Sequence, residues 1–243
     1  MPSSNTGTST STGGTATVKG AYCVSAQNSG VSGTALDTWG DGCPLTFSSV
    51  TASSGYTSGV AVDAAGNMVF TDPTHGLRVF YVSGAGTAGT VMKNAIIANN
   101  PGVTPQAGFI YLLWGGGTTS LGATPTLGTS TAATDSTLVK VAVSPQGNIY
   151  IGDSSKLIFY DMSSGYVRLL YASSSNVTAG NYCSGTSGQK SLSAYSDGCP
   201  ASKTVFSNGS GLGVAADAQD NLYLYDASSN STGMLVRKIL AQG

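Results

Sequence analysis

The stretch Val60–Asp72 reads VAVDAAGNMVFTD, and it recurs as VAVSPQGNIYIGD at Val141–Asp153 and as VAADAQDNLYLYD at Val214–Asp226. The three copies align without gaps, at spacings of 81 and 73 residues. In each copy a short apolar run leads into a turn that ends in Asn, and a second apolar run ends in Asp. Glycine and asparagine tolerate the positive φ that tight hairpin turns require. Each copy is therefore predicted to form a β-hairpin.

Apolar runs after each hairpin predict further strands. Third strands are expected at Leu77–Val82, Leu157–Tyr160 and Met234–Leu240, and fourth strands at Phe109–Trp114 and Tyr166–Tyr171. The small side chains of Val60–Val62 suit a strand that is buried on both faces. Four antiparallel strands per repeat, with the smallest side chains innermost, are typical of a β-propeller blade. The predicted fold class is all-β, with three blades near 59–114, 138–171 and 212–240.

The spacing of the repeats exceeds the roughly 40–50 residues that one blade needs, so insertions are expected between them. Thr87–Asn100 is predicted to be a short helix, because Val91, Ala95 and Ala98 recur at helical spacing. Gly115–Thr137, rich in Thr, Gly and Ala, is predicted to be a long loop. Residues 1–14 are predicted to be a flexible Ser/Thr/Gly-rich tail ahead of the blades at 15–243.

The composition narrows the classes of partner. Only 9% of the 243 residues are charged, whereas 40% are hydrophobic, which is enough to bury a core. The ten basic residues form no cluster, which argues against nucleic acid and anionic membranes as partners. The apolar runs are far shorter than the ~20 residues of a membrane helix, so no membrane insertion is expected.

Four cysteines lie in two matched elements. Residues 22–44 read YC…GDGCP and residues 182–200 read YC…SDGCP. Disulfides Cys23–Cys43 and Cys183–Cys199 are predicted, each worth about 3 kcal/mol in the chain-entropy model. Four reduced, buried cysteines are the alternative. Paired cysteines imply an oxidising compartment, so the protein is expected to be secreted, extracellular or at a cell surface.

The order of these motifs resembles a known repeat. D-G-x-P, a variable stretch and then G-V-A-V-D-x-x-G-N followed by an apolar strand is similar to the NHL repeat, in its secreted bacterial type with cysteine-containing loops between blades. The resemblance covers about Thr15 to Leu240, outside the insertions. It implies a β-propeller, often six-bladed, that binds other macromolecules; a minority of the family are lyases.

The chain departs from that pattern in its number of blades. Three blades do not close a ring, which needs four or more, and the third repeat lacks a fourth strand. TATVKGAY, at Thr15–Tyr22, precedes the first cysteine as a fourth strand would. An inter-chain strand is therefore predicted at Thr15, Ala16, Thr17, Val18 and Lys19.

Three arrangements would use that strand. Two chains pair reciprocally into a six-bladed ring, the chain belongs to a longer array of blades, or the strand is donated to a neighbour in an open polymer. The expected partners are therefore other copies of the chain or further propeller blades. A surface protein or a glycan is an additional candidate partner.

The sequence predicts no catalytic residue, no metal ligand and no cofactor. His75, the single histidine, lies in DPTHG and is expected to be an exposed turn residue, because one histidine cannot build a metal centre. The acids Asp63, Asp72 and Asp217 are expected to cap turns. GDG and SDG carry one acid each, which is too few for a calcium site. No nucleophile elbow or P-loop is present.

Aromatic side chains supply the candidate binding residues, since Trp and Tyr give contact area at low entropic cost. Trp39, in a cysteine-bounded loop, Tyr22 and Tyr182 are the candidates. The triplets at Asn176, Asn208 and Asn230 permit glycosylation.

The predicted function is a non-enzymatic extracellular interaction or structural module, a subunit of a surface assembly built by strand exchange. A propeller that binds a ligand or glycan, or a propeller lyase, is the alternative.

Overall fold

The computed structural model describes a subset of the chain in twelve segments. The described residues are 36, 40–45, 48, 59–72, 75–115, 119–122, 124–128, 140–152, 156–172, 198–200, 213–227 and 234–240. They form three antiparallel sheets and one helix, α1 (Gly86–Asn99), which confirms the all-β fold class and the predicted helix. No helix in this described part is long and apolar enough to cross a membrane.

The strands follow the repeats. The first sheet has the order β1-β2-β3-β4, the second β5-β9-β8-β7-β6 and the third β10-β11-β12. Their bounds are β1 Val60–Val62, β2 Met68–Asp72, β3 Gly76–Tyr81, β4 Phe109–Trp114, β5 Thr126–Leu127, β6 Lys140–Val143, β7 Ile149–Gly152, β8 Lys156–Asp161, β9 Tyr166–Ala172, β10 Gly213–Ala216, β11 Leu222–Ala227 and β12 Met234–Ile239. The predicted hairpins and third and fourth strands are confirmed. Part of the loop predicted at Gly115–Thr137 is instead β5, which extends the second sheet by pairing with β9.

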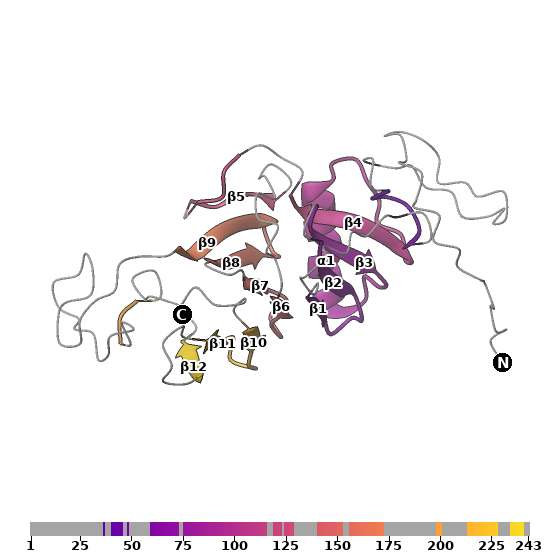
Figure 1. Ribbon diagram of the computed structural model, residues 1–243. Coiled ribbons are helices and arrows are strands. Elements are labelled where there is room, and N and C mark those ends of the chain that lie inside the picture. Colours follow the sequence, from indigo (N-terminus) through magenta and orange to yellow (C-terminus); the bar gives the residue numbers. More distant parts are fainter. Residues whose placement is uncertain are drawn as a thin grey trace, which may run out of the picture.

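The three sheets form a row, with the second sheet in the middle (Figure 1). The first strand of each repeat lies at the inner side, where β6 contacts both β1 and β10. Two apolar cores lie between neighbouring sheets. The larger core joins the first sheet, α1 and the second sheet, and the smaller core joins the second and third sheets.

The sheets stack in the same sense along this row. Val69 and Ile151 share the first core, whereas Tyr150, which the repeat aligns with Val69, shares the second core with Leu224. Side chains alternate between the faces of a strand, so each sheet offers the same face to the next. We call the face that carries Val69, Tyr150 and Tyr223 the forward face. The face that carries Phe70, Ile151 and Leu224 is the rear face.

The turn between the first two strands has the same backbone hydrogen bonds in all three repeats. In the first repeat the Asp63 amide donates to the Asn67 carbonyl over 3.0 Å, and equivalent bonds recur at Ser144 and Asp217. The Asp63 carboxylate also accepts from the Asn67 backbone and side chain, each at 2.8 Å. The shared Asn reaches further, because Asn67 Oδ1 accepts the Val82 amide at 2.7 Å. It thereby ties the hairpin turn to the end of β3.

The turns differ at the residue before Asn. Gly66 and Gly147 have φ of +86° and +91°, and Asp220 takes the same left-handed conformation with φ of +65°. A non-glycine residue there costs about 1 kcal/mol. The Asp220 carboxylate accepts hydrogen bonds from Asn148 at 3.3 Å and from the Tyr150 hydroxyl at 3.4 Å, which link the third sheet to the second. Burial, and then the charge of Asp220, raise the pKa of Tyr150 to about 12.

Helix α1 fills the outer part of the space between the first two sheets. It buries Met92, Ala95 and Ile96 in the larger core, with Asn99 beside them. The Asn99 side chain donates to the Tyr160 hydroxyl at 2.6 Å, which ties the helix to β8 of the second sheet. Of the three positions that predicted the helix, Ala95 is buried as expected, whereas Val91 and Ala98 are only partly buried at the border of the buried stripe.

Candidate functional site

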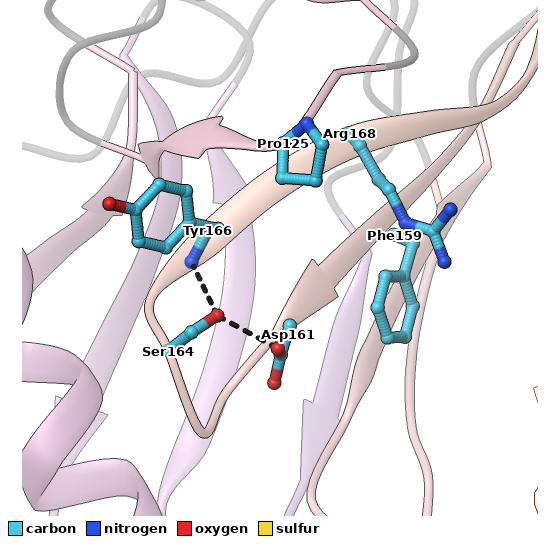
Figure 2. Close-up of a pocket in the computed structure, with 6 residues that line it drawn as sticks. All are labelled: Pro125, Phe159, Asp161, Ser164, Tyr166 and Arg168. Carbon is cyan, nitrogen blue, oxygen red and sulfur yellow. Dashed lines mark hydrogen bonds between the residues drawn. The ribbon is translucent and has the colours of Figure 1, made fainter.

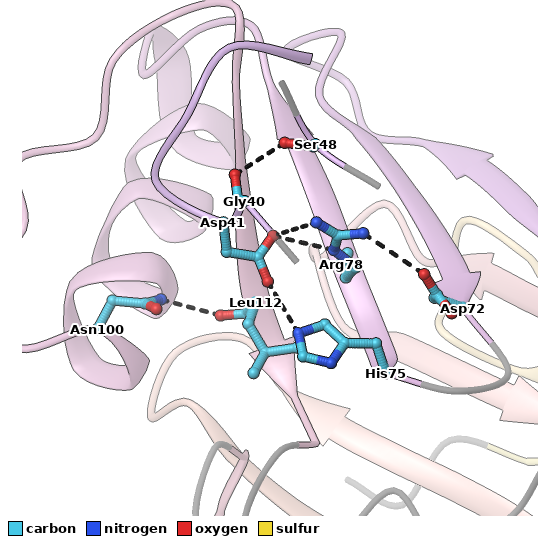
Figure 3. A network of polar contacts seen from close by, with 8 residues as sticks. All are labelled: Gly40, Asp41, Ser48, Asp72, His75, Arg78, Asn100 and Leu112. Atoms are coloured by element: carbon cyan, nitrogen blue, oxygen red, sulfur yellow. Dashed lines mark hydrogen bonds and ion pairs between the residues drawn. The ribbon is translucent and has the colours of Figure 1, made fainter. Parts of the chain in front are cut away.

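A buried cluster of charges lies on the rear face of the first sheet (Figure 3). Arg78 on β3 is fully buried, and its Nη2 and Nε donate to Asp41 Oδ1 over 2.6 Å and 2.9 Å. Arg78 Nη1 lies 3.4 Å from Asp72 Oδ2 at the end of β2. Two carboxylates therefore flank one guanidinium that has no exposed surface, a geometry in which each charge depends on its partners.

The position of His75 corrects the sequence-based expectation. It is only 6% exposed, and its Nε2 lies 3.2 Å from Asp41 Oδ2, so it is not the exposed turn residue that was predicted. The turn after β2 directs the ring inward because Asp41, 34 residues earlier, offers a buried acceptor. Among the described residues, no group of three or more His, Cys, Asp and Glu side chains is arranged to hold a metal ion.

The GDGCP motif delivers Asp41 to this cluster by docking along β4. The Gly42 amide donates to the Ile110 carbonyl over 2.7 Å, and the Ile110 amide donates to the Cys43 carbonyl over 3.0 Å. Pro44 then forms an isolated antiparallel bridge with Phe109. The motif thus adds a short strand-like layer outside β4 while its acid reaches back to β3. Its role here is to close the outer edge of the first sheet.

The same pairing can be traced through the repeats. The registers Phe70↔Arg78 and Leu224↔Arg237 place Arg237 at the position of Arg78, and Arg237 is also buried. The third repeat follows an SDGCP motif with Asp197, which lies outside the described residues. The second repeat has no such motif before it, and Ile158 occupies the position of the arginine. The acid and the arginine therefore occur together or not at all.

The two ends of the row leave apolar side chains exposed. Leu77 and Leu157 occupy equivalent positions on the forward faces and are fully buried by the next sheet. Val236, the equivalent residue of the third sheet, is 74% exposed. On the rear face of the first sheet, Val60 and Val62 are 57% and 58% exposed. The prediction that this strand is buried on both faces is therefore wrong, because no described sheet covers its rear face.

The third sheet also differs at its outer edge. In the first two sheets a fourth strand, β4 or β9, pairs with the third strand. Among the described residues, no strand pairs with the corresponding edge of β12. An unpaired strand edge is a template for β-strand addition. The candidate functional surface of the chain is therefore this edge together with the two exposed end faces.

A hollow on the second sheet forms a separate candidate site (Figure 2). It has a volume of about 340 Å³. Its described lining residues are Pro125, Phe159, Asp161, Ser164, Tyr166 and Arg168. Phe159 is partly buried beneath Arg168, whose Cζ lies 5.3 Å from the ring centroid.

Most of the predicted site residues lie outside the part of the chain that the structure describes. Those residues are Cys23, Cys183, Tyr22, Trp39, Tyr182, Asn176, Asn208, Asn230 and the segment Thr15–Tyr22. Cys43 is described and fully buried next to the Asp41 cluster. The pairings Cys23–Cys43 and Cys183–Cys199 stay predictions, as do the roles of the aromatic candidates.

Comparison with known proteins does not assign a family. No protein-family model matches the chain, and no curated protein matches it significantly. The resemblance to NHL repeats therefore rests on the motifs in the sequence.

Proposed function

We propose that the chain is a non-enzymatic interaction module made of three NHL-type β-propeller blades, and that it assembles with a second copy into a six-bladed ring. Each sheet is one blade, with its first strand nearest the central axis. Because the predicted disulfides form in oxidising compartments, the proposed location is extracellular or at a cell surface. The matched cysteine elements and the low charge agree with this location.

The observation that carries the proposal is the burial along one repeat position. Leu77 and Leu157 are buried because another sheet follows, and Val236 is 74% exposed where no described sheet follows. At the other end, Val60 and Val62 expose the rear face that preceding sheets cover in the second and third repeats. Burying exposed apolar surface is favourable by about 25 cal/mol per Å². The forward face of one copy therefore matches the rear face of another.

Because all sheets stack in the same sense, the junction between two copies joins the forward face of one third sheet to the rear face of the other copy's first sheet. A contact that joins different faces closes when the rotation between copies completes a ring. Propellers close with four or more blades, so three sheets alone leave a gap and two copies fill it. Each copy then contributes its third sheet to one junction and its first sheet to the other.

We assign the segment Thr15–Tyr22 of the second copy to the outer edge of β12, with which no described strand pairs. The segment stands ahead of a Cys and DGCP element, as β9 stands ahead of the second such element. Its first four residues, TATV, include β-branched side chains that favour strands. In this arrangement we expect the SDGCP motif to close the outer edge of the sheet, and Asp197 to pair with Arg237 as Asp41 pairs with Arg78.

Hydrogen exchange of the full chain and of a variant that lacks residues 1–22 tests the docking of this strand. About half of the β12 amides point to its outer edge, because strand amides alternate in direction. We expect these amides to exchange at least about tenfold faster after truncation, a loss of ~1.4 kcal/mol of protection. The amides of β3 serve as the internal control, because β4 pairs with β3 in both variants.

Equal protection of β12 in both variants would contradict the assignment of the strand. Loss of protection in β3 as well would mean that truncation unfolds the chain, and a peptide of residues 15–22 added to the truncated chain then decides the matter. The proposal requires that this peptide restores protection to β12.

A further inference from the structure

The space between the second and third sheets differs from the space between the first and second. Helix α1 covers the outer part of the first sheet's forward face, where Val79, Tyr81, Phe109 and Tyr111 are buried in the larger core. The cross-strand registers place Phe159, Asp161, Tyr166 and Arg168 at the equivalent positions of the second sheet. No described helix covers them. The hollow of Figure 2 therefore lies over the positions of the second sheet that correspond to those covered by α1 on the first sheet.

The side chains that line this hollow share one face of two paired strands. Phe159 pairs with Arg168 and Asp161 pairs with Tyr166 across β8 and β9, so all four project from the forward face. Pro125, which precedes β5, and Ser164, in the turn after β8, border the hollow. Compared with the first sheet, two apolar positions have become an acid and a base. The surface is thus suited to a polar ligand rather than to a packed helix.

Both charged groups are held in place by their neighbours. The Asp161 carboxylate accepts hydrogen bonds from the Ser163 hydroxyl at 2.7 Å and the Ser164 hydroxyl at 2.8 Å. Burial alone would raise the pKa of Asp161, but the hydrogen bonds from Ser163 and Ser164 outweigh it and lower the pKa below its ordinary value. Arg168 lies over Phe159, whose ring also packs against Tyr150 at 5.4 Å between centroids. The hollow therefore presents an oriented acceptor and an oriented donor.

An exposed aromatic ring completes the site. Tyr166 is 44% exposed at the rim, in a chain whose other tyrosines on the forward faces, such as Tyr111, are mostly buried. Aromatic and proline rings offer an apolar surface to the C–H groups of a ligand, while the carboxylate and guanidinium satisfy its hydroxyls. One negative and one positive group cancel, so a neutral ligand is favoured over a phosphate, which Asp161 would repel.

We infer that this hollow binds a neutral saccharide of one or two rings. Its volume of about 340 Å³ lies near the lower bound of ligand pockets, about 300 Å³, and suits a ligand of that size. The ring of Tyr166 supports a sugar face, Asp161 accepts from adjacent hydroxyls and Arg168 donates to them. This inference does not depend on the proposed assembly, since all described lining residues come from the second sheet.

Saturation-transfer NMR on the full chain tests the inference. The probes are methyl α-glucopyranoside, methyl β-galactopyranoside, methyl α-mannopyranoside and N-acetylglucosamine, each at millimolar concentration. At least one probe is expected to receive saturation at its ring C–H protons. Its Kd is expected to rise at least about tenfold in Tyr166→Ala and in Asp161→Asn, which corresponds to ~1.4 kcal/mol of binding free energy.

Tyr225→Ala is the matched control, because Tyr225 is also an exposed tyrosine, at 36%, but lies on the third sheet. It should leave saccharide binding unchanged even if it weakens assembly, so the two proposals fail separately. Circular dichroism confirms that each variant is folded. The inference is overturned if no saccharide binds, if Tyr166→Ala binds as tightly as the unchanged chain, or if only a zwitterionic probe such as glycylglycine binds.

Discussion

The first and third sheets begin from the same motifs and end differently. Both follow a DGCP motif, both have the Asp-Asn hairpin turn, and both bury an arginine at the same register position, Arg78 or Arg237. In the first sheet β4 and then the GDGCP motif cover the outer edge. In the third sheet the described strands stop at β12. The two repeats therefore share the motif and the arginine, but only the first has a described fourth strand.

The first and third sheets also differ in which of their faces is exposed. The rear face of the third sheet is covered by the second sheet, whereas the rear face of the first sheet leaves Val60 and Val62 open. The forward face of the third sheet leaves Val236 open. Exposed apolar patches of this kind mark interaction sites in soluble proteins. The two ends of the row are thus complementary in the way that successive sheets within the row are.

The largest effect is expected from breaking the charge cluster of the first sheet. Arg78→Ala leaves Asp41 and Asp72 buried without their shared cation. We expect this change to lower the free energy of unfolding by about 3–5 kcal/mol, as is typical when a buried ion pair loses one partner. Urea denaturation of the variant and of the unchanged chain measures the difference. Arg168→Ala is the control, since this exposed arginine should cost less than ~1 kcal/mol. A loss below ~1 kcal/mol for Arg78→Ala would show that the cluster does not hold the first sheet together.

The next largest effect is expected as a coupling energy in a double-mutant cycle on the third sheet. Asp197→Asn combined with Arg237→Gln should show a coupling energy of about 1–3 kcal/mol, because the two residues repeat the positions of Asp41 and Arg78. Asp197→Asn combined with Arg78→Gln serves as the unpaired control, with a coupling below ~0.5 kcal/mol. Equal coupling in both cycles would remove the equivalence of the two sheets.

Smaller changes in stability are expected at the hairpin turns, where one substitution adds backbone strain and another removes it. Gly66→Ala in the first repeat forces an alanine into φ of +86° and should cost about 1–2 kcal/mol. Asp220→Gly in the third repeat removes the same strain but loses the bonds to Asn148 and Tyr150, so its net change should stay below ~1 kcal/mol. Thermal unfolding of both variants compares them. A larger loss for Asp220→Gly would mean that its link to the second sheet outweighs the strain.

The smallest change in stability is expected at the open ends. Val236→Lys should alter the free energy of unfolding of the separated chain by less than ~0.5 kcal/mol, because the side chain is 74% exposed. The same change places a charge in the proposed junction and should abolish assembly in size-exclusion chromatography. Ile97→Lys is the control that should assemble normally, because Ile97 is also exposed, at 38%, but belongs to α1, which packs in the core between the first two sheets. Assembly of Val236→Lys would argue against the junction.

The local parts of the fold could be predicted from the sequence. Short apolar runs on either side of a turn that ends in Asn predicted the three hairpins, and helical spacing predicted α1, because these signals lie within a few residues of one another. The burial of His75 could not be read in this way, since it depends on Asp41, which is 34 residues away. The strand β5 was missed because two residues carry no periodic signal.

The candidate sites were harder to predict for the same reason. The Asp41–Arg78 pair has a sequence signal, the joint presence of DGCP and a third-strand arginine in the first and third repeats, which becomes visible once the register is known. The hollow needs the cross-strand pairs Phe159↔Arg168 and Asp161↔Tyr166, which no spacing along the chain defines. Long-range register is therefore the information that the structure adds.

The central claim is that a second copy completes the row of sheets, and light scattering under non-reducing conditions tests it most directly. The full chain, of 24.2 kDa, should have the mass of a dimer. A variant that lacks residues 1–22 should have the mass of one chain or show much weaker association, because it loses the strand that pairs with β12. A monomeric full chain, or a dimer that truncation leaves intact, would contradict the account.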